Sequence, residues 1–230
     1  MNNKICSVAI DGPAGAGKST IAKAAAAKFG FIYVDTGAIY RTVGLAAQRA
    51  GVDPKDEDLV LPLLPDLAIR FDYGEDGTQR MYLGDEDVSE KIRTPEISMY
   101  ASAVSAIPGV RAFLLDMQRD MARKTSVVMD GRDIGTVVLP DAGLKIFLTA
   151  SAEERARRRL AELAAKGDTS TFEEVLADML QRDRNDSTRA AAPLKAADDA
   201  FLVDTSHMSL QESIDFVCGK IAERFSLDAI

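Results

Sequence analysis

The residues from Gly12 to Ser19 match the pattern G-x-x-x-x-G-K-S/T, which is typical of loops that hold nucleotide phosphates. Glycines let such a loop curl until its backbone N–H groups face phosphate oxygens, and the positive end of the following helix adds to their field. We expect Lys18 to reach the β- and γ-phosphates, Ser19 to offer its hydroxyl to Mg²⁺, and Thr20 to add a second hydroxyl nearby. The pattern therefore predicts that the chain binds a nucleoside triphosphate. The alternative is a glycine-rich turn before an ordinary helix.

A second constellation lies at residues 35–41, which read Asp-Thr-Gly-Ala-Ile-Tyr-Arg. It follows an apolar run and precedes a helical pattern, so it would bring a carboxylate, a hydroxyl and a guanidinium to the same rim as the first loop. Arg41 suits an acceptor phosphate because a guanidinium can bind two oxygens at once. The alternative is a helix start capped by Asp35 or Thr36, and both interpretations can hold together.

A third constellation, at residues 130–135, reads Asp-Gly-Arg-Asp-Ile-Gly and follows another apolar run. An aspartate at the end of an apolar strand is typical of carboxylates that orient the water shell of Mg²⁺, and we expect this role for Asp130. Arg132 and Asp133 lie in the turn beyond this strand, and they would point toward any ligand that lies over the edge of the sheet. A charged pair in a surface turn is the alternative for these two residues.

Arg182, Asp186 and Arg189 form the fourth constellation. Their spacing of four and seven residues places them on one helical face if the helix continues that far. The two arginines and the aspartate between them would together bind a phosphate and a sugar hydroxyl. Phosphoryl transfer needs little covalent help from a protein; it needs in-line positioning and positive charge around the moving group. Arginines from several segments would supply that charge.

The elements that must position these residues are visible as short apolar runs that alternate with helical patterns. The predicted strands are Ser7–Ile10, Phe31–Val34, Ser126–Met129, Lys145–Thr149 and Phe201–Val203. Strands this short and apolar, separated by helices, indicate a parallel sheet covered on both faces, with ligands at the carboxyl ends of the strands. Ser151, Thr171 and Ser209, each followed three residues later by Glu, predict helix starts. The expected fold class is α/β, a five-stranded parallel sheet of the P-loop NTPase type with helices on both faces.

One region, at about residues 60–93, interrupts this alternation. The runs Leu67–Phe71, Gln79–Leu83 and Asp87–Val88 are separated by the glycine-containing segments 74–77 and 84–85. This pattern predicts a small antiparallel sheet inserted into the parallel fold.

A second interruption, at about residues 155–191, is rich in arginine. It predicts a helical hairpin that acts as a mobile lid. The alternative for its charge is a solvated helix face with pairs such as Asp178 with Arg182.

The composition and net charge of the chain limit the kinds of partner that it can bind. The 230 residues are 47% hydrophobic, enough for one substantial core, and the net charge of −8 argues against a nucleic-acid polymer as the main partner. No apolar run reaches about 18 residues and no secretory segment is visible, so we expect a cytoplasmic protein without a membrane span.

Cys6 and Cys218 are expected to be buried free thiols, and His207, the single histidine, to lie in a surface loop without a role.

Together, the four constellations resemble the bacterial cytidylate kinases over essentially the full length of the chain. The antiparallel insert and the segment after it resemble the enlarged nucleoside-monophosphate (NMP) binding domain of that family. The resemblance implies that ATP and CMP or dCMP react, with Mg²⁺, to give ADP and CDP or dCDP. With it we predict a core (1–40), an NMP-binding insert (41–102), a second core segment (103–154), a lid (155–191) and a C-terminal core strand and helix (192–230).

The resemblance also implies roles for residues at the matching positions. The residues expected to hold ATP are Gly12, Pro13, Ala14, Gly15, Ala16, Gly17, Lys18, Ser19 and Thr20. Those expected around the acceptor are Arg41, Arg132 and Arg189 at its phosphate, Ser102, Arg111 and Asp133 at cytosine, Arg182 and Asp186 at the pentose, and Thr36. Lys18, Arg132, Arg182 and Arg189 are the expected catalytic residues. A carboxylate suits the exocyclic amine of cytosine and a guanidinium suits O2 or N3. Asp183 is the alternative to Asp186 at the sugar.

Two further functions remain open. A P-loop kinase for another small acceptor, such as UMP or shikimate, would share Arg41, Asp133 and Arg189 as acceptor contacts. An ATP-binding switch that transfers no phosphate would have no need of the lid arginines or the insert. A GTPase is disfavoured because neither Asn-Lys-x-Asp nor a water-activating glutamine is evident. We expect a monomer, because the small kinases of the resembling family work alone.

Overall fold

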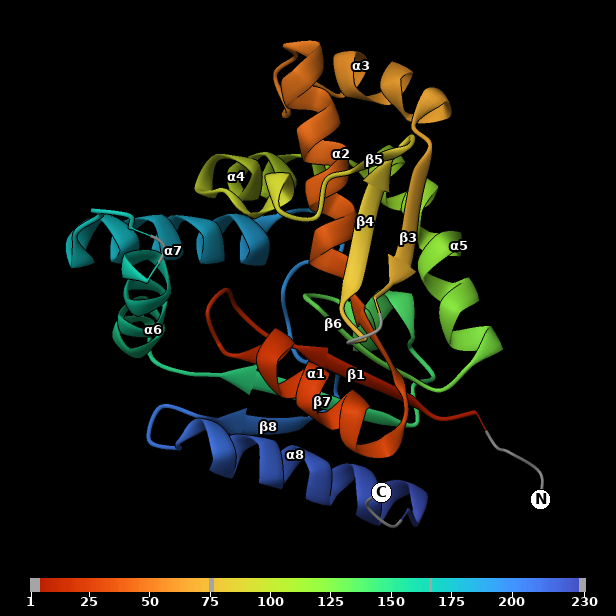
Figure 1. The fold of residues 1–230 in the computed structure, drawn as a ribbon, viewed down its shortest axis with the longest axis vertical. Coiled ribbons are helices and arrows are strands. Elements are labelled where there is room, and N and C mark those ends of the chain that lie inside the picture. The colour runs from red at the N-terminus through yellow and green to blue at the C-terminus, as the bar shows by residue number, and fades with distance from the viewer. Residues whose placement is uncertain (1–4, 75–76, 166, 228–230) are drawn as a thin grey trace.

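A computed structural model describes residues 5–74, 77–165 and 167–227. Its centre is a five-stranded sheet in the order β2-β6-β1-β7-β8, in which every neighbouring pair is parallel (Figure 1). The strands are β1 (Ser7–Asp11), β2 (Ile32–Asp35), β6 (Val127–Gly131), β7 (Leu144–Thr149) and β8 (Phe201–Asp204). All five predicted strands are confirmed to within one or two residues at each end, because short apolar runs between helices have few other ways to bury both faces.

Helices cover both faces of this sheet, as predicted. The longer ones are α1 (Lys18–Phe29), α2 (Thr36–Ala50), α4 (Pro95–Val104), α5 (Pro108–Lys124), α6 (Ala152–Ala164), α7 (Phe172–Thr188) and α8 (Leu210–Phe225). The shorter ones are α3 (Glu57–Val60), η1 (Leu61–Asp66), η2 (Lys91–Arg93) and η3 (Ile134–Val138). Alternate residues of β1 face opposite sides: Val8 and Ile10 pack in the core that includes α1 and α8, and Ala9 packs in the core that includes α2 and α5. The fold is therefore α/β, with one apolar core on each side of the sheet.

The three predicted helix starts are confirmed. Ser151, Thr171 and Ser209 are the N-caps of α6, α7 and α8, and each hydroxyl accepts the backbone N–H of the Glu three residues later. At Thr171 and Ser209 that Glu also accepts from the backbone of the cap residue, which completes a capping box.

A small antiparallel sheet is inserted after α2, in the order β3-β4-β5. Its strands are β3 (Ile69–Tyr73), β4 (Gln79–Leu83) and β5 (Glu86–Asp87). β3 begins two residues later than predicted, because the proline-containing helix η1 extends to Asp66 and Leu67 still donates its N–H to Leu64. β5 begins one residue earlier, because the turn after β4 is only two residues long. The predicted turn at 74–77 lies partly outside the described residues.

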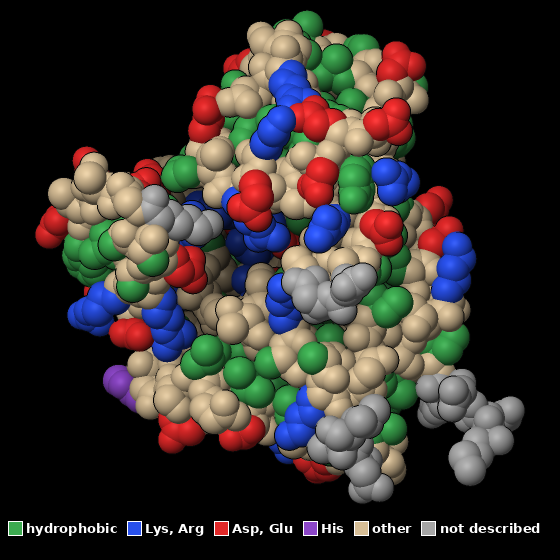
Figure 2. Space-filling model, in the orientation of Figure 1, with side chains coloured by type: hydrophobic (Ala, Val, Ile, Leu, Met, Phe, Trp, Pro, Cys, Tyr) green, Lys and Arg blue, Asp and Glu red, His purple; other side chains and the backbone are tan. Residues whose placement is uncertain are grey.

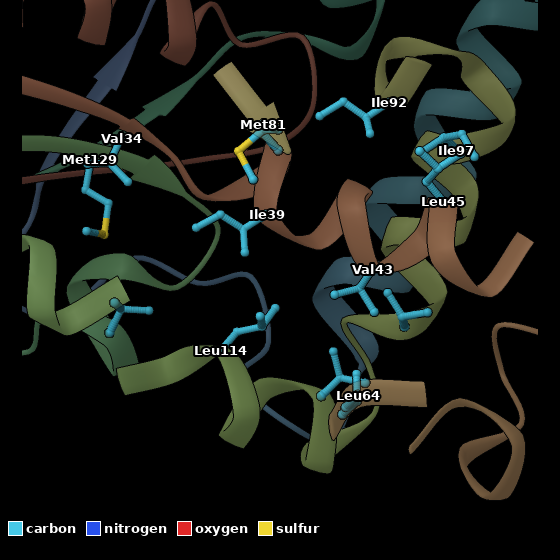
Figure 3. Packing of buried hydrophobic residues seen from close by; sticks show 14 of the residues in the cluster. Val34, Ile39, Val43, Leu45, Leu64, Met81, Ile92, Ile97, Leu114 and Met129 are labelled. Carbon is cyan, nitrogen blue, oxygen red and sulfur yellow. The ribbon is translucent and has the colours of Figure 1, made fainter. Parts of the chain in front are cut away.

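A buried apolar cluster joins this insert to the parallel sheet (Figure 3). Met81 of β4 packs in it with Ile39 of α2, Val34 of β2 and Leu114 of α5, and each of these side chains is at most 1% exposed. The small antiparallel sheet is therefore packed against the β2–α2 segment, which is the segment that carries Arg41.

α6 and α7 form the predicted helical hairpin. They share a small apolar cluster of their own, which includes Leu163, Val175 and Met179. Ala14 of the glycine-rich loop belongs to the same cluster, so the hairpin packs directly on that loop. Lys166, in the connection between the two helices, lies outside the described residues.

The remaining sequence expectations concern isolated residues. Cys6 and Cys218 are both buried, and His207 is exposed in a turn, as predicted. Within the described ranges, no helix taken singly has the length and hydropathy of a membrane span; α4 and α5 reach them only as a pair, with a bend of 99° between the two.

Gly44 lies where α2 packs closely against α4. A Cβ at this position would lie 3.0 Å from the backbone nitrogen of Ala101 and 3.1 Å from Cβ of Tyr100. The close approach matters for the cleft described below, because α2 carries Arg41 and α4 carries Ser102.

We expect Gly44→Val to lower the free energy of unfolding by about 1–3 kcal/mol, because the added methyl groups force the two helices apart. Gly219→Val is the matched control: Gly219 is also helical, a Cβ there meets nothing within 4 Å, and the change should be neutral or slightly stabilising. Urea denaturation of both variants measures the difference. Equal stability losses would contradict the proposed close packing.

Candidate active site

The carboxyl ends of β1, β2 and β6 open into a cleft of about 830 Å³. Its walls come from the glycine-rich loop, the start of α2, the turn after β6, the helices α4 and α5, and the α6–α7 hairpin. Figure 2 shows this face hollowed between the insert and the hairpin, with Lys and Arg side chains gathered around the hollow. This is the edge at which parallel α/β sheets bind ligands.

Most of the residues singled out in the sequence line this cleft. They are Ala14, Gly15, Gly17, Lys18, Ser19, Thr20, Thr36, Arg41, Ser102, Arg111, Asp130, Arg132, Asp133, Arg182, Asp186 and Arg189. Gly12, Pro13 and Ala16 belong to the same loop but not to the cleft wall. The fold therefore brings the four constellations into one place, while the role of each residue stays a prediction.

The glycine-rich loop has a backbone path that side chains would block. Gly12 has φ 148°, and a Cβ there would lie 1.9 Å from the carbonyl oxygen of Leu148. Gly17, the N-cap of α1, has φ 83°. A side chain at Gly12 would therefore collide with β7, and at Gly17 the left-handed conformation favours glycine.

Lys18 is buried, at 5% exposed, and its ammonium donates to the carbonyl of Pro13 at 2.7 Å. Burial and the neighbouring positive charge of Arg132 lower the pKa of Lys18 to about 7. An anion bound beside this ammonium would raise the pKa again, so the electrostatics here favour a bound phosphate.

Asp130 ends β6 within hydrogen-bond distance of the same loop. Its carboxylate accepts from Ser19 Oγ at 2.9 Å and from the hydroxyl of Tyr33 at 3.0 Å. Burial and the nearby Asp35 carboxylate raise the pKa of Asp130 to about 6. No local pattern pointed to Tyr33, because its contact with Asp130 arises only when β2 pairs with β6.

Asp35 is both a helix cap and an ion-pair partner, as the sequence allows. Its carboxylate accepts from the backbone N–H of Ala38 and from Arg41, both at 2.8 Å. Burial opposes the charge, but Arg41 and the Ala38 N–H hold the pKa of Asp35 below its usual value. Thr36 donates its hydroxyl to the carbonyl of Asp130 at 2.8 Å, which ties the start of α2 to β6.

Asp133 is not in a surface turn. It is 4% exposed, and its carboxylate pairs with Arg111 of α5 and, at 3.4 Å, with Arg189. Burial raises the pKa of Asp133, while the two guanidinium groups oppose this shift. Two segments that are distant in sequence thus converge on one carboxylate in the cleft.

The structure separates the two aspartates that compete for the sugar role. Asp186 accepts from Arg132 at 2.9 Å and from Ser102 Oγ at 3.3 Å, on the cleft wall. Despite burial, Arg132 and Arg182 hold its pKa below the usual value. Asp183 instead pairs with Arg155 at 2.7 Å.

Arg155 is a buried residue for which no individual role was predicted. Its guanidinium donates to the carbonyls of Ala14 and Ala150, both at 2.9 Å, in addition to its pair with Asp183. It therefore joins the glycine-rich loop to both helices of the hairpin. The arginine run at 155–159 was the only sequence signal, and it did not distinguish this inward-facing member from its solvated neighbours.

Arg182 departs from the solvated pairing considered above. Among the ion pairs of the described ranges, none joins it to Asp178, and its enclosed Nε has no hydrogen-bond partner. Burial and the charge of Arg132 lower its pKa to about 10. An enclosed guanidinium with an unused donor, on the wall of the cleft, is suited to an anion that enters there.

Arg189 does not share the helical face of Arg182 and Asp186, because α7 ends at Thr188 and Arg189 is its extended C-cap residue. It donates to Ser105 Oγ at 2.9 Å and to the carbonyl of Ala192 at 2.7 Å. Its guanidinium still reaches the cleft, but from this extended C-cap position rather than from the helical face.

A family model described as cytidylate kinase matches residues 8–223. A relative named cytidylate kinase from Caldicellulosiruptor bescii is 49% identical over 222 residues, which cover 96% of each chain. One of that name from Geobacter sulfurreducens is 50% identical over 217 residues, with 94% and 93% coverage. Among solved structures, a shikimate kinase from Bacteroides thetaiotaomicron aligns with a TM-score of 0.49 and 14% identity, over 97% of this chain and 100% of that one.

The contact between Arg155 and Asp183 makes a prediction about stability. Asp183→Ala would leave a buried guanidinium without its carboxylate, so we expect the free energy of unfolding to fall by about 2–4 kcal/mol. Asp178→Ala, an exposed position on the same helix, should change it by less than about 0.5 kcal/mol. Thermal denaturation of both variants measures this. A negligible loss in Asp183→Ala would mean that Arg155 does not depend on it.

Proposed function

The chain belongs to the cytidylate kinase family, and on that premise we propose that it transfers the γ-phosphoryl group of ATP to CMP or dCMP, giving ADP and CDP or dCDP. The observation that carries the proposal is a single cleft in which a phosphate-binding loop faces a buried carboxylate–arginine cluster, Asp133 with Arg111 and Arg189. A loop of this kind accounts for the donor nucleotide. The cluster accounts for an acceptor that is both anionic and rich in hydrogen-bonding groups.

On the donor side, the backbone N–H groups of residues 12–20 would hold the phosphates of ATP at the N-terminus of α1. Lys18 would leave its bond to Pro13 and turn to the β- and γ-phosphates, whose charge restores its ammonium form. The burial of Lys18 strengthens its interaction with the charge that develops as the phosphoryl group moves.

The residues near the loop fit Mg²⁺, which we propose as the cofactor. Within the described ranges, no three His, Cys, Asp or Glu side chains are grouped to form a full metal cage. Ser19 and Asp130 instead offer one hydroxyl and one buried carboxylate, 2.9 Å apart. Mg²⁺ commonly takes one or two protein oxygens and completes its shell with water and substrate phosphates. When bound, it would neutralise phosphate charge and orient the donor.

On the acceptor side, Asp133 is proposed to accept from the exocyclic amine of cytosine, while Arg111 donates to O2 or N3 and Ser102 contributes a hydroxyl. In the absence of the base, Arg111 and Asp133 satisfy each other. A buried polar group that loses its partner costs free energy, so a base without the matching amine would bind poorly.

The acceptor phosphate and sugar have their own proposed partners. Arg41, Arg132 and Arg189 would surround the phosphate. Asp186, already placed beside Ser102 and Arg132, is proposed to accept from a pentose hydroxyl, with Arg182 beside it. In-line attack by the acceptor phosphate would then take place among guanidinium groups from α2, the turn after β6 and the end of α7.

We also propose that the enzyme works as a cytoplasmic monomer, with residues 41–102 as its NMP-binding part and 155–191 as its lid, and without nucleic-acid or membrane partners. The overall charge of −8 supports a small-molecule substrate rather than a nucleic-acid polymer, because binding a phosphate backbone requires an extended basic surface.

The test is Mg²⁺-ATP turnover, followed as ADP formation, with CMP, dCMP, UMP, AMP, GMP and shikimate supplied separately. We expect turnover to be strongest with CMP or dCMP. Preference for UMP or shikimate would assign the cleft to another acceptor, and slow hydrolysis that is independent of the acceptor would favour an ATP-binding switch.

A substitution tests base recognition directly. Asp133→Ala should raise KM for CMP by about 10- to 100-fold and reduce the CMP-over-UMP preference, because the removed carboxylate is a charged, desolvated partner of the base. KM for ATP should change by less than about threefold, because the donor loop is untouched. Asp141→Ala, an exposed aspartate further along the same segment, is the control. An unchanged CMP/UMP ratio in Asp133→Ala would refute the assignment.

A further inference from the structure

Asp11, the last residue of β1, has no role in the function proposed above. It is 4% exposed, and both of its carboxylate oxygens are used. Oδ1 accepts from the backbone N–H of Ile134 and Oδ2 from that of Gly135, both at 2.7 Å. These N–H groups open η3, the π-helical turn that directly follows Arg132 and Asp133. One buried carboxylate therefore fixes the end of β1 to the turn that carries two acceptor-side residues.

Asp133 stands at the N-cap position of this turn. An aspartate at an N-cap ordinarily accepts from the backbone N–H of the second or third residue of its own helix, here Gly135 or Thr136. The Asp133 side chain makes no such bond; its carboxylate is directed to Arg111 and Arg189 instead. Asp11, from another strand, already accepts from Gly135, which an N-cap side chain could bind, and also from Ile134; this leaves the Asp133 carboxylate directed to the cleft.

The other end of η3 is held in a similar way. Arg119 of α5 donates from Nε to the carbonyl of Val138 and from Nη2 to that of Val137, both at 3.0 Å. π-helical turns are rare and occur mostly at functional sites. This one is held at both ends by charged side chains from other elements, in addition to the packing of its own Ile134 and Val138 in the apolar core.

The charge state of Asp11 suits this role. Burial raises its pKa to about 6, the Asp133 charge adds to the shift, and the two N–H bonds and Lys18 oppose it. Asp11 is therefore ionised at neutral pH and can accept both hydrogen bonds.

We propose that Asp11 is a positioning residue for acceptor recognition: it caps the turn after β6 in place of Asp133 and so keeps the Asp133 carboxylate directed at the acceptor base. The choice of CMP as probe rests on the proposed function. The capping itself rests on the geometry alone.

The first test is Asp11→Asn. The amide preserves size but places an NH₂ group against one of the two backbone N–H groups, so Asp133 gains a competing donor to cap. We expect KM for CMP to rise about tenfold and the CMP-over-UMP preference in kcat/KM to fall by a similar factor, with KM for ATP within about twofold.

Arg119→Gln is the matched control, because it loosens the opposite end of the same turn without offering Asp133 a free N–H. It should lower the melting temperature but leave the CMP/UMP preference unchanged. Our inference is wrong if Asp11→Asn keeps the wild-type preference, if its KM values for ATP and CMP rise equally, or if both variants lose the preference to the same extent.

A second measurement does not require that Asp11→Asn folds. Amide hydrogen exchange at Ile134 and Gly135 is compared between the wild type and Asp133→Ala. If Asp11 is the cap, both amides stay protected when Asp133 is removed; loss of protection would overturn the inference. This result stands whether or not the wild type phosphorylates CMP, so failure of the proposed function and failure of this inference can be told apart.

Discussion

The architecture of the cleft depends on holding several positive groups close together in a partly buried place. Lys18 and Arg182 each have a lowered pKa, and in both the charge of Arg132 adds to the effect of burial. Such a cluster is unfavourable until anions enter, so the protein must balance it in the meantime. The carboxylates that do so are Asp35 on Arg41, Asp186 on Arg132, and Asp133 on Arg111 and Arg189. They also orient the guanidinium groups, so the cleft presents positive charge to an entering anion although the net charge of the chain is −8.

Each balancing carboxylate is itself fixed by the backbone. Asp35 caps α2, and this restricts its position to the end of β2. Asp133 sits beside a turn that Asp11 caps in its place. Asp186 lies in the last turn of α7, and Leu194 donates its backbone N–H to the Asp186 carbonyl at 2.8 Å. Positioning at this site is therefore achieved by helix ends and strand ends rather than by long side chains reaching across the cleft.

The structural features that depend on local sequence pattern could be predicted. The five strands, the hairpin and the residues that gather at the cleft follow from apolar runs, helix caps and the placement of ligands at strand ends. The contacts of Asp11, of Tyr33 and of Arg155 with Ala14 could not be found this way, because the residues they join are about 100 or more positions apart and are brought together by strand order and helix packing. Local pattern could not tell which of Asp183 and Asp186 faces the cleft, because residues three positions apart lie on nearly the same face of a helix. In the structure their partners differ: Asp183 pairs with Arg155 and Asp186 with Arg132.

The small antiparallel sheet contacts the acceptor side of the cleft at β2, which is an edge strand of the parallel sheet. β2 is the outer strand, and Gln79 of β4 completes its end by accepting the backbone N–H of Asp35 at 2.8 Å. The side chain of the same aspartate caps α2 and holds Arg41. Because Met81 also packs beside Ile39 in the common core, movement of the small antiparallel sheet relative to β2 and α2 would disrupt this packing. Any closure must either carry the Asp35–Arg41 pair with it or break the Gln79 bond, so movement of the insert and the position of a phosphate-binding arginine are mechanically linked.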